Sequence, residues 1–246
     1  DLPYFSIKEE NSALGWRGLR FTLDHPEIFS AQIRAMLKAS IGLNNLHILL
    51  PMVTSVNEVE EVLYLLERDW MAVQEEEQVK ITKPKIGIMV EVPSVLLQID
   101  EFAELVDFFS VGSNDLTQYL LAVDRNNPHV ANVYSHFHPS VLRALKRLVQ
   151  QCHEYNKPIS ICGEMAGDPL SAVLLMAMGF NTLSMSSSNI LRVRKAICHV
   201  PMTDAIALLD EALKMNNPLM IKSWMEYYFK KHGLGDMVKT NRSLTA

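Results

Sequence analysis

Acidic and amide side chains stand at the ends of apolar segments that have the length of buried strands. Glu91 lies at the end of segment 85–92, and Asn114 and Asp115 directly follow segment 106–112. Parallel strands gather their carboxyl ends at one edge of a sheet, so we expect these side chains to lie close together. Two carboxylates, Glu91 and Asp115, would then offer hard oxygen ligands to a divalent ion such as Mg²⁺.

Each of these residues also has a purely structural interpretation. A buried, unpaired carboxylate is costly, so Glu91 needs a cation or a hydrogen-bond partner, and a salt bridge to a neighbouring strand would serve equally well. Asn114 and Asp115 are both suited to cap the helix that follows them. The occurrence of two acids at adjacent strand ends favours a metal site more than either acid does alone.

Two arginines and one cysteine complete the set of candidate residues. Arg17 lies between Gly15 and Gly18, which allow close backbone approach to a ligand, and Arg125 lies in a loop that can fold back to the strand ends. Surface salt bridges are the alternative for both arginines. Cys162 ends an apolar segment before a glycine, although a cysteine in that position is more often an inert core residue.

Other thiol and imidazole groups are interpreted as structural. Cys152 lies within an apolar helix pattern, and Cys198 has no nearby partner in the sequence. The loop histidines do not have the spacing of a metal site. They are His129, His136 and His138.

Alternating strands and helices must position these residues. Strands are predicted at 46–50, 85–92, 106–112, 158–162 and 181–185, with a weaker sixth at 17–22. Apolar residues at three- and four-residue spacing predict helices at 27–40, 55–75, 115–123, 139–155 and 168–178, and two more within 203–231. This alternation indicates parallel βαβ units. Ser55 with Glu58 predicts a capping box, and Asp168 a cap before Pro169.

Length and charge narrow the class of protein. The 246 residues match one α/β barrel, so we expect a single domain over 1–246, with the barrel in 1–200 and helices and a tail in 201–246. A net charge of −5 argues against binding to nucleic acid or to an anionic membrane. Three cysteines without a Cys-x-x-Cys pair favour the reducing cytoplasm. No apolar run reaches the ~20 residues of a membrane span.

Four motifs carry a resemblance to a known family. They are Gly15-Trp16-Arg17, 90–93 (Val-Glu-Val-Pro), 108–125 with its Ser-Asn-Asp-Leu-Thr-Gln-Tyr core, and 162–167 (Cys-Gly-Glu-Met-Ala-Gly). Over about Leu2 to Arg194 the chain closely resembles the phosphoenolpyruvate-binding domain of enzyme I of the bacterial sugar phosphotransferase system. The string 18–26 is most similar to the nitrogen-related paralogue.

The resemblance implies a (β/α)8 TIM barrel that binds phosphoenolpyruvate and Mg²⁺. It assigns Mg²⁺ to Glu91 and Asp115, and the phosphate and carboxylate of the substrate to Arg17, Asn114, Asp115 and Arg125. It assigns to Cys162 the protonation of enolpyruvate. The phosphoryl group would pass to a histidine on a separate swivelling domain and then to a phosphocarrier protein, and the protein would be a homodimer.

The sequence also departs from the family pattern. It lacks an initiator Met, and the resemblance enters the barrel at its third strand, taken as 17–22. We therefore expect a fragment without the first two strands, which carry two further phosphate-binding arginines, and without the swivelling domain, so that complete turnover by the chain alone is not expected. Segments 17–22 and 181–186 would be unpaired sheet edges. The alternatives are a domain of pyruvate phosphate dikinase or phosphoenolpyruvate synthase, and a noncatalytic phosphoenolpyruvate-sensing dimerisation module.

Overall fold

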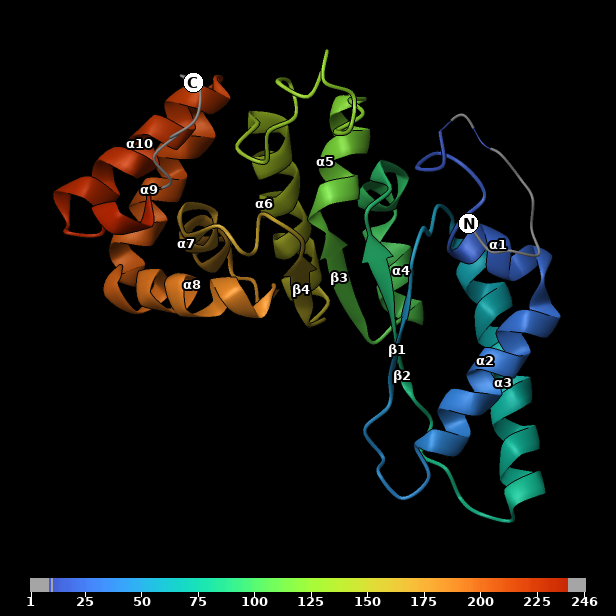
Figure 1. The fold of residues 1–246 in the computed structure, drawn as a ribbon. Coiled ribbons are helices and arrows are strands. Elements are labelled where there is room, and N and C mark those ends of the chain that lie inside the picture. The colour runs from blue at the N-terminus through green and yellow to red at the C-terminus, as the bar shows by residue number, and fades with distance from the viewer. Residues whose placement is uncertain (1–8, 10, 239–246) are drawn as a thin grey trace.

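The computed structural model describes residue 9 and residues 11–238 of the chain. One sheet of five parallel strands forms its centre, in the order β1-β2-β3-β4-β5 (Figure 1). The strands are β1 (His47–Leu50), β2 (Lys85–Val90), β3 (Phe108–Gly112), β4 (Ile159–Cys162) and β5 (Thr182–Ser184). Spatial order equals chain order throughout. A doubly wound sheet would reverse its strand order at a switch point, so this sheet has the winding of a barrel wall.

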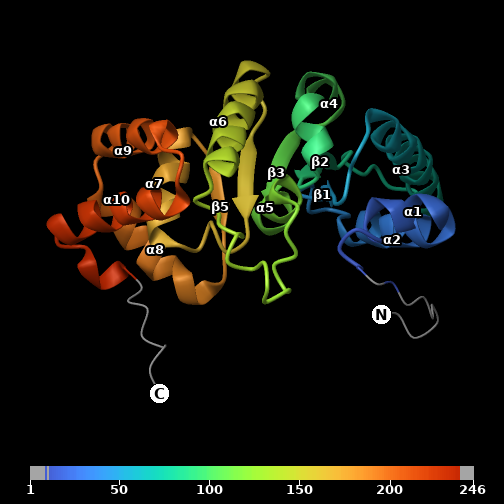
Figure 2. The same ribbon diagram turned by 90° about the horizontal axis from the view of Figure 1, so that it is seen from above.

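Helices cover one side of the sheet and flank its two ends (Figure 2). Viewed from above, α3, α4 and α6 lie along one side of the strands, α1 and α2 lie beside α3, and α7 to α10 lie at the opposite end (Figure 2). Their bounds are α1 (Leu19–Asp24), α2 (Pro26–Ala39), α3 (Val56–Glu77), α4 (Ile99–Leu105), α5 (Ser113–Leu121), α6 (Pro139–Glu154), α7 (Pro169–Met178), α8 (Ser187–His199), α9 (Met202–Lys214) and α10 (Pro218–Lys231). Within the described residues, none of these helices is both long and apolar enough to span a membrane.

The sixth strand predicted at 17–22 is wrong. This segment enters helix α1, and the Leu19 amide donates to the Pro51 carbonyl at 3.1 Å. Leu19, Phe21 and Leu23 alternate as in a strand, but Leu19 and Leu23 are also four residues apart, and a six-residue segment does not separate the two periods. The edges of the described sheet are therefore β1 and β5, not segment 17–22.

Most of the other predicted elements form with small changes of boundary. The Ser55 capping box is present, with the Ser55 amide donating to Glu58 at 3.0 Å, and Asp168 caps α7 by accepting from the Ser171 amide at 3.0 Å. The helix predicted at 115–123 already begins at Ser113. The two helices predicted within 203–231 are α9 and α10, whereas α4 and α8 were not predicted. Residues 239–246 of the predicted tail lie outside the described residues.

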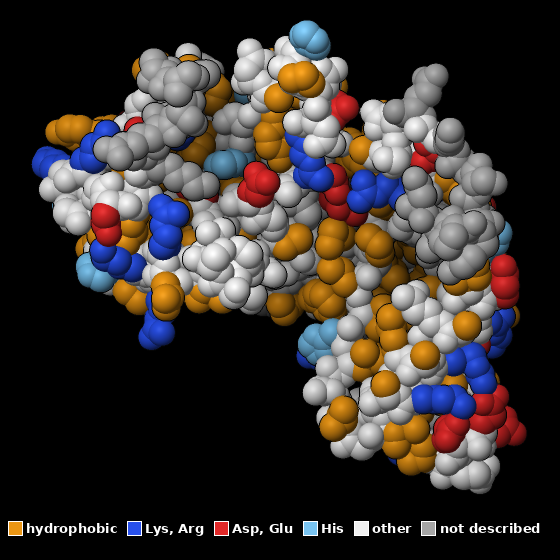
Figure 3. All heavy atoms as spheres, viewed as in Figure 1, with side chains coloured by type: hydrophobic (Ala, Val, Ile, Leu, Met, Phe, Trp, Pro, Cys, Tyr) orange, Lys and Arg blue, Asp and Glu red, His pale blue; other side chains and the backbone are white. Residues whose placement is uncertain are grey.

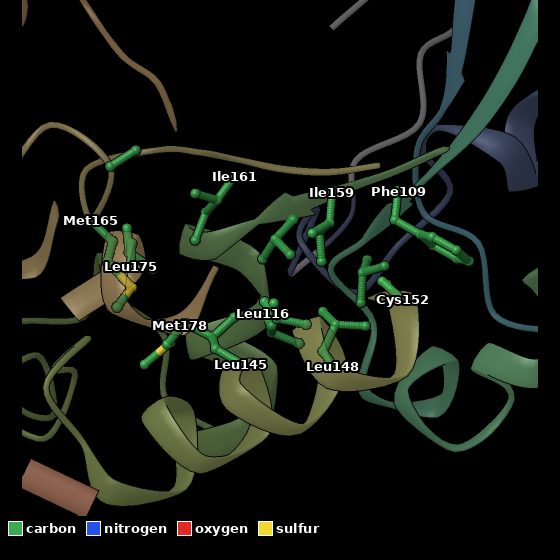
Figure 4. Close-up of a cluster of buried hydrophobic side chains, with 14 of the residues drawn as sticks. Phe109, Leu116, Leu145, Leu148, Cys152, Ile159, Ile161, Met165, Leu175 and Met178 are labelled. Atoms are coloured by element: carbon green, nitrogen blue, oxygen red, sulfur yellow. The ribbon is translucent and has the colours of Figure 1, made fainter. Parts of the chain in front are cut away.

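The core lies between the sheet and its covering helices. Register pairs Phe109 with Ile159 and Val111 with Ile161, so these four side chains share the face that α6 covers. Buried side chains from β3, β4, α5, α6, α7 and the turn between β4 and α7 meet there (Figure 4), including Leu116, Leu145, Leu148, Cys152, Met165, Leu175 and Met178. Full burial of one such side chain contributes about 1.5–3 kcal/mol. Burial also raises the pKa of Cys152 to about 12, in agreement with a structural role.

Candidate active site

The candidate residues lie at the carboxyl ends of β2, β3 and β4. Alternation places Val90 and Ile161 toward the helices, so Glu91 and Cys162 project to the opposite face of the sheet. Gly112 is paired with Cys162 and lies beside Glu91. Acidic and basic side chains adjoin at this end of the sheet, near the start of α5 (Figure 3). The structure thus brings together groups that are far apart in the sequence.

Glu91 is only 3% exposed. Its Oε1 accepts a hydrogen bond from the Met52 amide at 2.7 Å, so the partner that a buried carboxylate requires is a backbone group after β1. A Cβ on Gly112 would lie 2.7 Å from Glu91 Oε2, which shows why glycine is needed beside this carboxylate. Burial, opposed by the Met52 hydrogen bond and reinforced by the neighbouring Asp115, raises the pKa of Glu91.

Asp115 lies in the first turn of α5, between two arginines. Arg17 Nη2 is 3.4 Å from Oδ2, and Arg125 Nη2 is 3.8 Å from Oδ1. The Asp115 Oδ1 atom is buried and has no hydrogen-bond partner among the described residues. Both predicted arginines are therefore held at the strand ends, on opposite oxygens of one carboxylate. The capping alternative for Asp115 does not apply, because the residue lies inside the helix and Gly112 occupies the N-cap position.

The two carboxylates fit a hard divalent ion. Asp115 Oδ1 is an orphaned, buried acceptor. Burial and then the charge of Asp115 raise the pKa of Glu91, and a cation between the two carboxylates would oppose both effects. Among the described residues, no group of three His, Cys, Asp or Glu side chains could hold a metal by itself. The two carboxylates of Glu91 and Asp115 suit Mg²⁺, which is commonly held by one or two carboxylates and by oxygens of the substrate and water.

The loop that carries Arg17 is fixed by hydrogen bonds to its backbone. Arg20 Nη1 donates to the carbonyls of Leu14 and Gly15, both at 3.0 Å, and the Tyr119 hydroxyl donates to the Ala13 carbonyl. Gly18 has a φ of +59°, which turns the chain into α1. The Arg17 side chain itself remains 42% exposed, so it can meet a ligand that enters from solvent.

Cys162 ends β4 in a turn that Asn114 and Ser113 support. Ser113 Oγ donates to the Cys162 carbonyl at 2.6 Å, and Asn114 Oδ1 accepts from the Glu164 amide at 3.2 Å. The amide NH₂ of Asn114 is a separate donor that can serve a ligand. Burial raises the pKa of the Cys162 thiol, and the charges of Glu91 and Asp115 raise it further. At neutral pH the thiol therefore keeps its proton, which suits a proton donor and not a nucleophile.

Sequence reasoning missed the residues that hold the site together. Gln118 Oε1 accepts from the Arg125 amide at 3.2 Å, and the Tyr134 hydroxyl donates to the Asn114 carbonyl at 3.3 Å. Tyr119 and Gln118 stand inside a recognised motif and could have been singled out, whereas nothing in the sequence around Tyr134 signals its contact. Of the loop histidines, His138 caps α6 by accepting from the Ser140 amide at 3.2 Å.

We expect Gly163→Ala to destabilise the protein by about 2–4 kcal/mol. Gly163 has a φ of +104°, and a Cβ would lie 2.4 Å from Ser113 Oγ. Gly42→Ala is the matched control, because Gly42 has a φ of +80° but no atom within 4 Å of the built Cβ, and backbone strain alone should cost about 1 kcal/mol. Urea unfolding measures both variants. Equal losses would show that the contact with Ser113 imposes no constraint.

A second prediction concerns the pH dependence of stability. With a raised pKa, native Glu91 retains its proton where the unfolded chain has lost it, so its contribution is fully present below its ordinary pKa of 4.5 and is lost as pH rises through the raised value. Glu91→Gln should therefore flatten the fall in unfolding free energy above pH 4.5. Glu60→Gln, at an exposed residue of α3, is the control. The unfolding free energy is measured with urea at each pH. If it falls equally with pH in wild type and in Glu91→Gln, the expectation is contradicted.

Comparison with known proteins agrees with this geometry. The profile of the family described as "PEP-utilising enzyme, PEP-binding domain" matches residues 1–202. A Salmonella typhimurium relative named "Phosphoenolpyruvate-dependent phosphotransferase system" is 44% identical over 238 residues, which are 97% of this chain and 32% of that protein. The "Phosphoenolpyruvate-protein phosphotransferase" of Haemophilus influenzae is 39% identical over 235 residues, 95% of this chain and 41% of that protein. The chain thus spans well under half the length of these relatives.

A solved structure supports the fold alone. A citrate lyase from Burkholderia xenovorans superposes with a TM-score of 0.51 at 16% identity, covering 83% of this chain and 69% of that chain. The expected α/β fold with a parallel, barrel-type sheet is thereby confirmed, and the family expected from the four motifs is confirmed by the profile match. The chain belongs to the family of phosphoenolpyruvate-binding domains of PEP-utilising enzymes.

Proposed function

We propose that the chain is the phosphoenolpyruvate-binding catalytic domain of a phosphoenolpyruvate-protein phosphotransferase. One observation carries the proposal: Asp115 lies between two guanidinium groups, while Glu91 and Cys162 end the strands on either side of β3. The two guanidinium groups can bind a phosphorylated enol and compensate its charge, and the two carboxylates can hold a metal ion that adds to this compensation. The protonated thiol can then protonate the product.

Each residue has a defined task in this proposal. Arg17 and Arg125 bind phosphate and carboxylate oxygens of phosphoenolpyruvate through charge-assisted hydrogen bonds, and the amide of Asn114 donates to the phosphate. Glu91 and Asp115 hold Mg²⁺, which supplies charge neutralisation at the phosphoryl oxygens when it is bound. Asp115 is central because it contacts both guanidinium groups. When Asp115 holds the metal ion, these guanidinium groups are available to the substrate.

The reaction balances with one acceptor and one proton. The bond between phosphorus and the enol oxygen breaks while a bond forms from phosphorus to a histidine nitrogen of a separate domain, and the enolate of pyruvate is released. The Cys162 thiol then gives its proton to the methylene carbon, which becomes the methyl group of pyruvate, and the thiolate takes up a proton from solvent before the next turnover. The raised pKa of Cys162 supports this step, because it keeps the thiol protonated until the enolate forms.

The wider setting belongs to the same proposal. The names of the relatives support a protein as the acceptor of the phosphoryl group. The motif resemblance favours a phosphocarrier protein as the final acceptor and a cytoplasmic homodimer as the working form. The likeness of string 18–26 to the nitrogen-related paralogue supports a regulatory branch of the phosphotransferase system. We therefore propose that the protein acts at the start of a regulatory phosphorelay.

Titration of phosphoenolpyruvate with Mg²⁺ into the ¹⁵N-labelled chain tests the proposal. Amide signals of residues 112–118 and 162–164 should shift with saturation, and Arg17→Gln should weaken binding by about tenfold or more, as expected for loss of a charge-assisted contact of about 1.5–3 kcal/mol. Lys222→Gln, a change on the exposed face of α10, serves as the control. Shifts scattered outside the strand ends, or unchanged affinity in Arg17→Gln, would count against the function.

A further inference from the structure

The turn after β4 is held from one side by the start of α5. Ser113 Oγ donates to the Cys162 carbonyl at 2.6 Å, and Asn114 Oδ1 accepts from the Glu164 amide at 3.2 Å. Two consecutive side chains of α5 therefore bind the two peptide groups that flank Gly163. The residue that bears the candidate thiol is thus tied to the first turn of α5.

The Ser113 hydroxyl is packed directly against the backbone of this turn. Ser113 is 3% exposed, and a Cβ on Gly163 would overlap its Oγ. Strand register fixes the other side of the cysteine, because Cys162 is paired with Gly112. Since the peptide group is planar, a fixed carbonyl and a fixed strand together determine the direction of the Cα–Cβ bond that carries the thiol.

We propose that Ser113 is a positioning residue, whose hydroxyl aims the Cys162 thiol at the methylene carbon of enolpyruvate without touching the substrate itself. The inference rests on the proposed function, in which Cys162 protonates this carbon. The hydroxyl is buried and bound to the carbonyl of the cysteine, so it acts through that residue. Substrate binding is assigned to other groups, Arg17 and Arg125 among them, and should not need the hydroxyl.

Ser171 offers a matched control. It is fully buried in the first turn of α7, and its Oγ donates to Asp168 Oδ2 at 2.8 Å. Ser113→Ala and Ser171→Ala each remove one buried hydroxyl and one short hydrogen bond, but the bond of Ser171 does not involve the cysteine. Ser113→Thr keeps a hydroxyl at the position and is the conservative variant. Gly163→Ala displaces Ser113 Oγ and should change the thiol in the same direction as Ser113→Ala.

Ketonisation of free enolpyruvate tests the inference on this chain. A phosphatase releases enolpyruvate from phosphoenolpyruvate, and its conversion to pyruvate is followed by ultraviolet absorbance with the chain and Mn²⁺ present. The thiol proton goes to the methylene carbon, the enol oxygen gives its proton to solvent, and solvent reprotonates the thiolate. We expect Ser113→Ala to lower the chain-catalysed rate about tenfold or more, because a displacement of about 1 Å can cost about 10²-fold.

The other variants separate positioning from general destabilisation. Ser113→Thr should recover most of the rate, and Ser171→Ala should keep the wild-type rate. In a Cys162→Ala background, Ser113→Ala should have no further effect, because the two residues act as one unit. The dissociation constant of phosphoenolpyruvate with Mn²⁺, measured by calorimetry, should be the same in Ser113→Ala and wild type. Thermal unfolding verifies that each variant is folded.

A second readout needs no ligand. Cys162 is half-buried and Cys198 is exposed on α8, so the ratio of their alkylation rates with iodoacetamide, measured by mass spectrometry, contains its own reference. The ratio of Cys162 to Cys198 alkylation should rise in Ser113→Ala, because the turn is released, and should stay at the wild-type value in Ser171→Ala.

Three results would each overturn the inference. They are a wild-type rate of ketonisation in Ser113→Ala, an unchanged alkylation ratio, and a loss of phosphoenolpyruvate affinity that equals the loss of rate, which would show that the hydroxyl serves the substrate. If wild type does not accelerate ketonisation, the proposed role of Cys162 fails. The alkylation ratio then still decides whether Ser113 holds the cysteine in place.

Discussion

Asp115→Asn is expected to remove Mn²⁺ binding by the chain. The substitution keeps the shape of the side chain but deletes the charge that lies between Arg17 and Arg125, whose guanidinium groups would then repel a cation. Two opposite unit charges 4 Å apart attract each other by about 4 kcal/mol in an environment of effective dielectric constant 20. Loss of this attraction between Asp115 and the ion corresponds to about a thousandfold weaker binding. Paramagnetic broadening of the amide signals of Glu91 and Cys162 by Mn²⁺ is the measurement.

Asp124→Asn is the matched control for this experiment. Asp124 is exposed in the segment after α5, and its Oδ1 accepts from the Asn126 amide, a bond that the asparagine oxygen can also accept. The control removes the same charge a few residues from the site and should leave the broadening intact. Persistent broadening at Glu91 in Asp115→Asn would instead place the ion elsewhere, and the metal assignment of both carboxylates would have to be abandoned.

The positions of the two carboxylates and the thiol could be predicted from the sequence because they depend on one topological rule. Glu91, Asp115 and Cys162 each follow a recognisable apolar segment, and parallel strands in sequential order must bring those ends together. The position of Arg17 beside Asp115 agrees with its motif, but no rule about strand ends predicts this position. Its contact spans 98 residues of sequence and depends on how the loop before α1 folds over β1.

The parts that could not be predicted depend on long-range contacts or on ambiguous short patterns. The Met52 amide that binds Glu91 carries no sequence signal, since any non-proline residue has such a donor. The contact of Tyr134 with Asn114 crosses an irregular segment whose path no periodicity determines. Segment 17–22 was misassigned because the spacing of Leu19 and Leu23 satisfies both a strand and a single helical turn.

In a longer protein that carries the proposed phosphoryl-accepting histidine domain, we expect Cys162→Ala to leave phosphorylation intact but to release enolpyruvate. The thiol lies at the end of β4, where burial raises its pKa and the charges of Glu91 and Asp115 raise it further. It is thus a protonated acid beside the position proposed for the enolate. Loss of a positioned general acid lowers the rate of its step by about 10²–10⁴-fold, so protonation would pass to bulk water.

Substrate labelled stereospecifically at its methylene carbon separates the two steps of this reaction. Phosphohistidine should form in Cys162→Ala at a rate near that of wild type, while the methyl group of pyruvate made in D₂O becomes racemic. Cys198→Ala, at an exposed thiol on α8, is the control and should retain stereospecific protonation. Stereospecific pyruvate from Cys162→Ala would show that another group delivers the proton. The raised pKa of Cys162 would then reflect only its burial beside two carboxylates, and the thiol would be structural.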